Sequence, residues 1–384
     1  MKLLLMDLHD DILYEIISYL DVASIGRLSC ACRKIYRLCQ EDVVWRRIAR
    51  RLVNIGKDDT SSRIRCLPIK ERCRISLNWI NGRCRDKCLM KFGINLLPWL
   101  QLEDQHLFLT FGADICCYKL RPNGEIPRSP RALCVGHQDD VCRFVKKGPN
   151  LVSGGRDGAV ISWHVRTGRI RHIYHGHTGD VNCVDLKQDL ILSGSRDQTV
   201  KLWSKDSGVC HYTVHAQDRV WAVKFNPWDS SFISGTASYF QITPLRLWDI
   251  QTGKLRQVIG RSYRKGAGIL DAHFESPHCL LSCGYDTYIR IWDIRHNHNT
   301  SVLQFEEPDD SAIYCIQTDG KNLIASGSSR YGVVRLWDKR MTKCMQTFYV
   351  GSHISSPVYS LKFNSTQMYV ALANCLRRLD FRSR

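Results

Sequence analysis

The sequence predicts a mainly β protein in which a seven-bladed β-propeller follows a small three-helix module. Two observations carry this prediction. Tryptophans recur in one sequence frame at separations of 40, 45, 44 and 45 residues, a period typical of four-stranded propeller blades. The first fifty residues instead carry apolar side chains at helical spacing. We therefore expect a helical module over residues 1–50, a basic linker with a short helix over 51–83, and the propeller over 84–384.

The N-terminal module is predicted from apolar positions that recur every three or four residues. Asp10 or Asp11 stands near the start of the first helix, Asp21 can cap the second, and Asp42 favours the start of the third. So short a chain exposes more apolar surface than it can bury by itself, so a partner or the propeller must cover it. The apolar positions of the three helices are Ile12, Leu13, Ile16, Ile17 and Leu20, then Ile25, Leu28, Cys32 and Ile35, then Val44, Trp45 and Ile48.

The segment that follows is the electropositive centre of a chain whose formal net charge is +18. Residues 46–91 contain 14 Lys and Arg side chains against 4 Asp and Glu. Such a field steers acidic partners, although a solvated linker would carry the same charge. Within it, residues 68–79 are typical of a short basic helix that could fix the distance between module and propeller.

The propeller is predicted from a repeated unit. In each unit an alternating stretch such as Val200–Trp203 puts apolar side chains on one face of a strand. A turn of small residues such as Ser193–Asp197 precedes it, because tight hairpins need Gly and Asp. The five clear frames centre on Trp163, Trp203, Trp248, Trp292 and Trp337.

Two degenerate units complete a ring of seven. Tyr118 stands in the frame 45 residues before Trp163, and Leu379 stands in it 42 residues after Trp337. The last unit stops at its third strand. Since an open sheet edge invites aggregation, we expect residues 84–92 to supply the missing outer strand.

The innermost strands are expected to carry small side chains where the blades approach the axis. Arg143 breaks this pattern in the first clear unit. The small positions are Cys183, Ala222, Ala272, Cys315 and Ser360.

This repeat, with Gly136-His137 and Gly176-His177 ahead of the turns, resembles the WD repeat family. The resemblance implies a buried hydrogen-bonded network of histidine, turn aspartate and tryptophan in each regular blade. Repetition at blade spacing indicates that these residues are structural and not catalytic. The two networks comprise His137, Asp157 and Trp163, and His177, Asp197 and Trp203.

The order of residues in the module, over 8–21, 28–33 and 45–48, is similar to the F-box, which binds the Skp adaptor of cullin-based ubiquitin ligases. His9 stands where that family usually has proline, so the first contact is expected to be weaker. Some of the carried-over positions will belong to the core of the module. The adaptor contacts that the resemblance implies are Leu8, Ile12, Ile16, Leu20, Leu28, Cys32 and Trp45.

Together the two resemblances point to the F-box and WD repeat family, and the stretches 218–221, 281–288 and 331–338 resemble one member of it. The implied function is a non-catalytic substrate receptor: the F-box binds the Skp-type adaptor and, through it, the cullin scaffold, while the propeller holds the protein to be ubiquitinated. Arginines in the turns could grip phosphate or carboxylate, so the substrate is expected to be acidic or phosphorylated. The expected substrate-binding residues are Arg156, Arg196, Arg219, Tyr285 and Arg330.

Three other functions are weighed against this one. The module could serve a scaffold unrelated to ubiquitin. The basic linker could bind nucleic acid, which we disfavour because aromatic residues are not interleaved there for base stacking. An enzyme is disfavoured because none of the common nucleophile, phosphate-loop or zinc-protease motifs occurs.

Composition adds further expectations. The 18 cysteines are scattered and include no C-x2-C pair, so we expect reduced packing residues, no metal site and no cofactor. No run of about 18 apolar residues is present, so no contact with a membrane is expected. The expected location is the cytoplasm, the nucleus or both.

Overall fold

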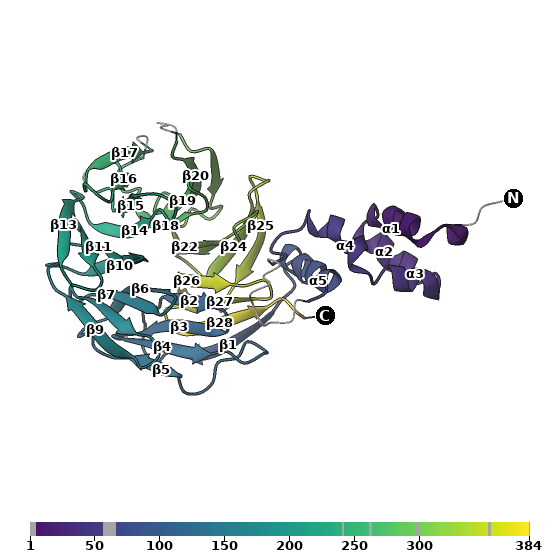
Figure 1. Ribbon diagram of the computed structural model, residues 1–384, viewed down its shortest axis with the longest axis horizontal. Coiled ribbons are helices and arrows are strands. Elements are labelled where there is room, and N and C mark those ends of the chain that lie inside the picture. Colours follow the sequence, from purple (N-terminus) through teal and green to yellow (C-terminus); the bar gives the residue numbers. More distant parts are fainter. Residues whose placement is uncertain are drawn as a thin grey trace.

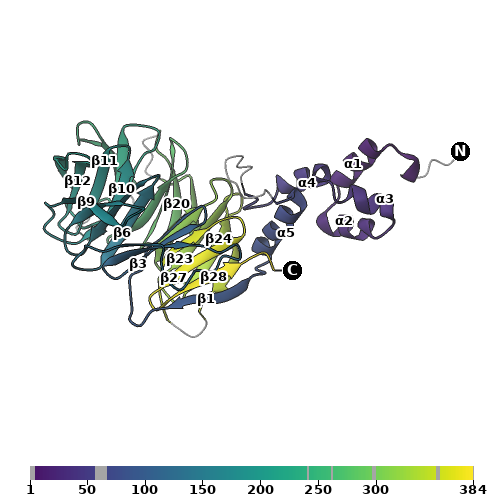
Figure 2. The same cartoon turned by 60° about the horizontal axis from the view of Figure 1, so that its bottom comes forward.

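The ring and the module are separate in the computed structural model, which describes residues 5–56, 67–239, 242–260, 263–295, 300–351 and 355–383. Figure 1 shows seven sheets arranged around a central axis, with the helices projecting from one side. Figure 2 shows the same projection from the edge of the ring, with α1, α2 and α3 farthest from the sheets. The predicted propeller and N-terminal helical module are both confirmed.

The module contains four α-helices where the sequence predicted three. The second predicted helix divides at Cys32, whose backbone is extended at φ −161° and ψ 165°, and Cys32 becomes the N-cap of the next helix. Asp21 caps the helix before it by accepting a hydrogen bond from the Ser24 N–H at 2.6 Å. The helices are η1 (Leu5–Asp7), α1 (Asp10–Ser18), α2 (Val22–Ser29), α3 (Arg33–Leu38), α4 (Asp42–Ala49) and, beyond the module, α5 (Ile69–Ile80).

Each blade is a four-stranded antiparallel sheet, and the first strand of each unit faces the axis and contacts its counterparts in the neighbouring blades. Blade 1 contains β2 (Leu100–Glu103), β3 (His106–Phe111), β4 (Asp114–Lys119) and β5 (Ala132–Cys134). Blade 2 contains β6 (Val141–Lys147), β7 (Asn150–Gly155), β8 (Val160–His164) and β9 (Arg169–Tyr174). Blade 3 contains β10 (Val181–Lys187), β11 (Leu190–Ser195), β12 (Thr199–Ser204) and β13 (Cys210–His215).

Blade 4 contains β14 (Val220–Phe225), β15 (Ser231–Thr236), β16 (Leu245–Asp249) and β17 (Leu255–Ile259). Blade 5 contains β18 (Ile269–Phe274), β19 (Cys279–Gly284), β20 (Tyr288–Asp293) and β21 (Leu303–Glu306). Blade 6 contains β22 (Ile313–Thr318), β23 (Leu323–Ser328), β24 (Val333–Asp338) and β25 (Cys344–Tyr349). Blade 7 contains β26 (Val358–Phe363), β27 (Gln367–Leu372), β28 (Cys375–Asp380) and β1 (Arg85–Lys91).

Blade 7 closes the ring with strands from both ends of the propeller. β1 pairs antiparallel with β28, from Arg85 opposite Asp380 to Lys91 opposite Cys375. The outer strand predicted over residues 84–92 is therefore confirmed, as are Tyr118 and Leu379 in the third strands of their blades. Closure leaves no blade with an unpaired inner or third strand.

The small residues expected at the axis are correct except in blade 5. A β-bulge follows the first residue of each inner strand from β6 to β26, and after it the equivalent positions hold Cys183, Ala222, Asp271 and Cys315. The position in blade 5 is thus Asp271 and not Ala272, because Asp271 pairs with Cys283 as Cys183 pairs with Gly194. Arg143 and Asp271 are the two members of this ring with charged side chains.

Helix α5 belongs to both bodies of the protein. Cys73 packs in the core of the module, whereas Trp79 is fully buried in the core of blades 6 and 7. The Trp79 ring stacks on Phe381 with centroids 3.7 Å apart, and its indole N–H donates to the Ser365 carbonyl at 3.0 Å. The Asn78 amide donates to the Phe381 carbonyl at 2.7 Å. The short helix predicted over residues 68–79 is therefore present and is packed as a rigid joint. The part of the basic linker over 57–66 lies outside the described residues.

Candidate functional site: a channel mouth and an exposed helix face

The predicted networks of blades 2 and 3 are present and buried. In blade 2, His137 Nδ1 lies 2.9 Å from Asp157 Oδ2, and His137 Nε2 lies 2.8 Å from Ser153 Oγ. The Trp163 indole N–H donates to the same Ser153 oxygen at 2.8 Å. Blade 3 repeats this geometry with His177, Asp197, Ser193 and Trp203.

Electrostatics indicates that these groups serve the fold. Burial lowers the pKa of His137, although the Asp157 carboxylate opposes this effect. Burial also tends to raise the pKa of Asp157, but N–H donors from Gln138 and Ala159, together with His137, outweigh it and the net pKa is lowered. At neutral pH a neutral imidazole therefore bridges an ionised carboxylate and a serine hydroxyl. The network anchors the turn that carries Arg156.

On the side of the ring that carries the Arg156 turn, the central channel opens into a pocket of about 330 Å³. We name this pocket the channel mouth. Equivalent positions of successive blades form its wall, and four of them are aromatic. These four were missed from the sequence, because Trp99 precedes its strand and the other three stand in the bulges of their inner strands, which follow no alternating pattern. The equivalent wall residues are Trp99, Cys142, Asn182, Trp221, Leu270, Tyr314 and Tyr359.

Three of the five predicted substrate-binding residues line this channel mouth: Arg156, Arg196 and Tyr285. Arg156 lies 3.7 Å from Asp140 and Arg196 lies 3.5 Å from Asp180, and both guanidinium groups remain well exposed. Arg219 and Arg330 are exposed but are not part of the pocket wall. Arg143, which was predicted only as a break in the pattern, also lines the pocket. The mouth thus offers guanidinium groups beside aromatic rings and can take an anionic group next to an apolar one.

At the other end of the molecule, α1 presents apolar side chains to solvent. Ile12, Ile16 and Tyr19 are 50%, 41% and 62% exposed and share one helix face, while Leu13 and Ile17 on the opposite face are buried in the module core. Tyr19 was missed from the sequence. We name Ile12, Ile16 and Tyr19 the α1 face.

The other predicted adaptor contacts occupy several environments. Leu8, Leu20 and Leu28 are partly buried against the module core. Cys32 is exposed. Trp45 is only 5% exposed and its indole N–H donates to the Cys39 carbonyl at 2.9 Å, so it is a core residue and not a surface contact.

Within the described residues, no helix is long and apolar enough to cross a membrane, and no group of three or more His, Cys, Asp or Glu side chains could hold a metal ion. Seventeen described cysteines are free thiols. The channel mouth and the α1 face are therefore the two candidate sites.

Comparison with known proteins places the chain in a family. The F-box-like family model matches residues 7–51, and the WD domain, G-beta repeat model matches 168–204, 261–293 and 299–338. The chain is 44% identical to human F-box/WD repeat-containing protein 4 (dactylin) over 98% of its own length and 92% of that protein. The mouse protein of the same name is also 44% identical, over 98% of this chain and 93% of its own.

The chain joins an F-box to a WD-repeat propeller, and it belongs to the F-box and WD repeat protein family. The member resembled by stretches 218–221, 281–288 and 331–338 is dactylin. Two solved structures share the fold: the WD40 β-propeller domain of Doa1, with a TM-score of 0.62 at 17% identity over 77% of this chain and 97% of that one, and the computationally designed Ika8 protein, with 0.57 at 22% over 73% and 82%.

Proposed function

We propose that this protein is the substrate receptor of a Skp/cullin/F-box ubiquitin ligase, and that it works in the cytoplasm, the nucleus or both. The α1 face binds the Skp-type adaptor, and through it the cullin, while the channel mouth holds the protein to be ubiquitinated. The receptor contributes effective concentration and no catalytic group.

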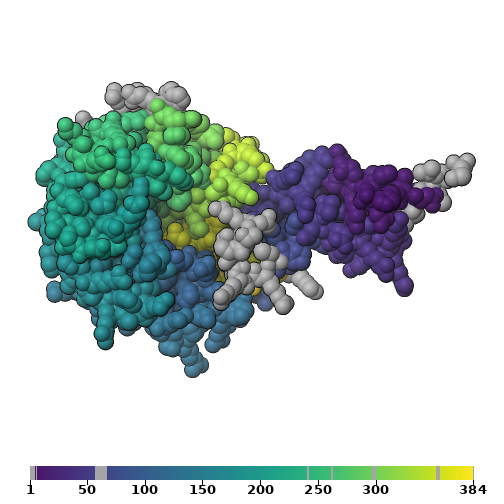
Figure 3. All heavy atoms as spheres, viewed as in Figure 1, coloured from purple at the N-terminus to yellow at the C-terminus, as the bar shows by residue number. Residues whose placement is uncertain are grey.

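The observation that carries the proposal is the placement of the α1 face. The module has its own core, formed by residues such as Leu13, Ile17 and Trp45, and yet three large apolar side chains remain exposed on one face of α1. The space-filling view shows the dark purple part of the module standing clear of the ring, so the propeller does not cover this part of the chain (Figure 3). An apolar face that the protein leaves exposed is typical of a docking surface.

The channel mouth supports the second half of the proposal. Its arginines suit a carboxylate or phosphate, and its aromatic walls suit an apolar neighbour in the same segment. We therefore expect a substrate segment that is acidic or phosphorylated.

Adaptor binding is tested by changing the α1 face without touching the core. Ile12→Asp places a carboxylate in the first half of the helix and Ile16→Lys places an ammonium in the second, so each suits the helix dipole. The double variant should lose the Skp-type adaptor and the cullin on affinity purification. Val209→Asp is the matched control, since Val209 is an exposed apolar residue on the propeller. Adaptor binding that survives the double change would overturn this half of the proposal.

Substrate binding is tested separately at the channel mouth. Arg156→Glu with Arg196→Glu should release captured substrates and retain the adaptor, whereas Arg169→Glu, an exposed change on β9, should retain both. Unchanged capture by the double variant would contradict the assignment of this pocket. Retention of substrates by a protein that binds no Skp-type adaptor would instead favour a scaffold unrelated to ubiquitin.

Nucleic-acid binding through the basic segment stays a weaker alternative. Its α5 residues are engaged within the protein: Arg72 Nε donates to the Ile55 carbonyl at 2.8 Å, and Arg74 pairs with Glu71 and donates to the Ser383 carbonyl. Affinity for a duplex that falls steeply with salt would favour this alternative.

A further inference from the structure

Blade 5 departs from the regular blades at the point where a histidine would stand. Trp292 donates to Ser282 Oγ at 2.8 Å, as Trp163 does to Ser153. A Cβ added at Gly260 would meet the edge of the Trp292 ring, as one added at Gly136 would meet the edge of the Trp163 ring, but the next residue in the sequence is arginine and not histidine. The Tyr263 hydroxyl lies 3.5 Å from Ser282 Oγ, the atom that the histidine contacts in blades 2 and 3 at the equivalent serine.

The turn aspartate of blade 5 consequently has a different partner. Asp286 corresponds to Asp157 and Asp197, but it forms an ion pair with Arg290, two residues before the tryptophan. The Arg290 guanidinium lies between the rings of Tyr263 and Tyr288, 4.9 Å and 4.8 Å from their centroids. A pair held in this way is neutral and preorganised.

The corresponding arginines of blades 4 and 6 show that this arrangement is unusual. Arg246 donates to the Ala216 carbonyl at 3.1 Å, and Arg335 pairs with Glu307 and Asp309; both are buried. The side chain of Arg290 is 18% exposed and lines a pocket of about 510 Å³. The same position is therefore sealed in blades 4 and 6 and open in blade 5. We name this cavity the blade 5 pocket.

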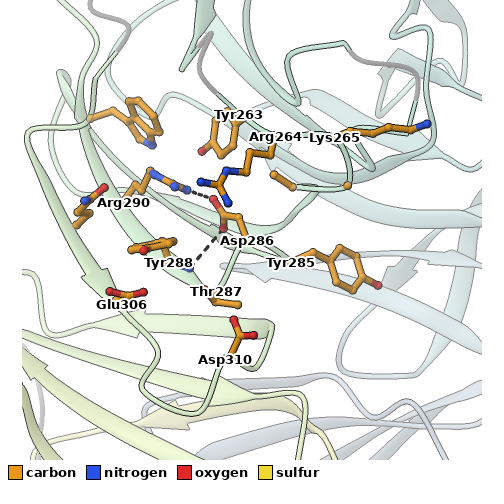
Figure 4. A pocket seen from close by; sticks show the side chains of 14 residues that line it. Tyr263, Arg264, Lys265, Tyr285, Asp286, Thr287, Tyr288, Arg290, Glu306 and Asp310 are labelled. Carbon is orange, nitrogen blue, oxygen red and sulfur yellow. Dashed lines mark hydrogen bonds and ion pairs between the residues drawn. The ribbon is translucent and has the colours of Figure 1, made fainter.

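The walls of the blade 5 pocket carry opposite charges. Arg264 and Lys265 stand on one side, and neither forms an ion pair within the described part of the chain. Glu306 and Asp310 stand on the other side (Figure 4). Figure 4 also shows the guanidinium groups of Arg264 and Arg290 converging near Asp286, with Tyr288 between Arg290 and Glu306. The positive wall suits a carboxylate or phosphate and the negative wall suits an ammonium or guanidinium.

From this arrangement we infer that the blade 5 pocket is a second substrate subsite, which binds a peptide segment carrying an anionic and a basic side chain a few residues apart. Tyr285 lines both this pocket and the channel mouth, so one extended segment can occupy both. The inference deepens the proposed function and rests on it only in calling the peptide a substrate. A segment that is merely acidic would bring its carboxylates close to those of Glu306 and Asp310, which would repel them.

The test uses the full chain purified with its Skp-type adaptor and a displayed library of random short peptides. Enriched peptides should pair one acidic with one basic residue. Arg264→Glu with Lys265→Glu should weaken an enriched peptide at least about tenfold. Glu306→Lys with Asp310→Lys should do the same. All four side chains are exposed, so these variants are expected to fold. Arg169→Glu is the matched control.

Peptides that lack the charge pair, binding indifferent to both double variants, or no enrichment at all would each overturn the inference. Replacing the acidic residue of an enriched peptide by phosphoserine distinguishes carboxylate from phosphate as the anionic source. Adaptor retention is measured on the same samples. A protein that binds the peptides but no Skp-type adaptor would refute the proposed ligase role alone. A protein that binds the adaptor but not the peptides would refute this subsite alone.

Discussion

Arg143 of blade 2 and Asp271 of blade 5 form an ion pair across the central channel, with Nη1 and Oδ1 3.3 Å apart. Both side chains are buried. The Arg143 guanidinium also stacks on the Trp99 ring at 3.9 Å, and Asp271 accepts backbone N–H bonds from Ala272 and Ile316. The two charged residues of the inner ring therefore complement one another and join blades on opposite sides of the propeller.

Replacing one member of the Arg143–Asp271 ion pair should lower the free energy of unfolding more than replacing both members together. Arg143→Met leaves the Asp271 carboxylate buried without its guanidinium partner, and we expect the free energy of unfolding to fall by about 3–5 kcal/mol. Arg143→Met with Asp271→Asn should cost less than the two single changes together, because no carboxylate is left without its guanidinium partner and the amide oxygen can still accept an N–H bond from Ala272 or Ile316. Urea denaturation of Arg143→Met, Asp271→Asn and the double variant measures the coupling. Additive losses would show that the pair contributes nothing as a pair.

Helix α5 should be needed for the stability of the ring. Trp79→Ala removes a fully buried ring that stacks on Phe381, and we expect a loss of about 3–5 kcal/mol in thermal or chemical denaturation of the propeller. Trp228→Ala is the matched control because Trp228 is 52% exposed. Equal stability of the two variants would show that α5 is a passive tether.

Acidification should destabilise the propeller through His137. Burial lowers the pKa of this imidazole in the folded protein, so the unfolded chain takes up its proton first. The stabilising contribution is fully present above the unfolded pKa of about 6.5 and is lost as pH falls from there toward the lowered folded pKa. The melting temperature of the wild-type protein should therefore fall between about pH 7.5 and about pH 5.5.

His137→Gln should show a lower melting temperature throughout and a flatter dependence on pH. The control is His211→Gln, since His211 is exposed. A wild-type pH slope retained in full by the His137 variant would assign the titration to another group.

Cysteines of the helical module should be alkylated faster than those in the core of the ring. Burial raises the pKa of Cys183 and Cys315 to about 12, so little thiolate forms at neutral pH. Cys30 and Cys32 are exposed. Native protein treated with iodoacetamide should be labelled at Cys30 and Cys32 first, as read by peptide mass mapping. Bound adaptor should protect Cys32 if it is a contact, and early labelling of Cys183 would contradict its placement in the core.

Most of the fold could be predicted from the repeat, and the errors are confined to single positions. Trp163, Trp203 and the other frames located the third strands because a buried indole with a serine acceptor recurs in five blades. Asp271 was missed because it stands 21 residues before Trp292, whereas Cys183 stands 20 residues before Trp203, and the small Ala272 occupies the position that the shorter spacing predicts. The division of the second predicted helix at Cys32 was missed because the apolar spacing continues through the break.

The candidate sites were predicted less completely than the fold. The turn residues Arg156, Arg196 and Tyr285 could be placed near the axis from their position in the repeat. The aromatic wall of the channel mouth could not, since bulge residues obey no simple periodicity. Nor could the blade 5 pocket, which depends on Tyr263 reaching Ser282 where blades 2 and 3 use a histidine.

The pairing of β1 with β28 has a consequence for the order in which the nascent chain matures. A ribosome delivers the helical module and β1 first, and β28 last. β1 therefore has no pairing partner until β28 has been synthesised, and the ring of blades cannot close before synthesis reaches residue 380. A chain that stops before β28 would carry a folded F-box-like module on an unclosed ring.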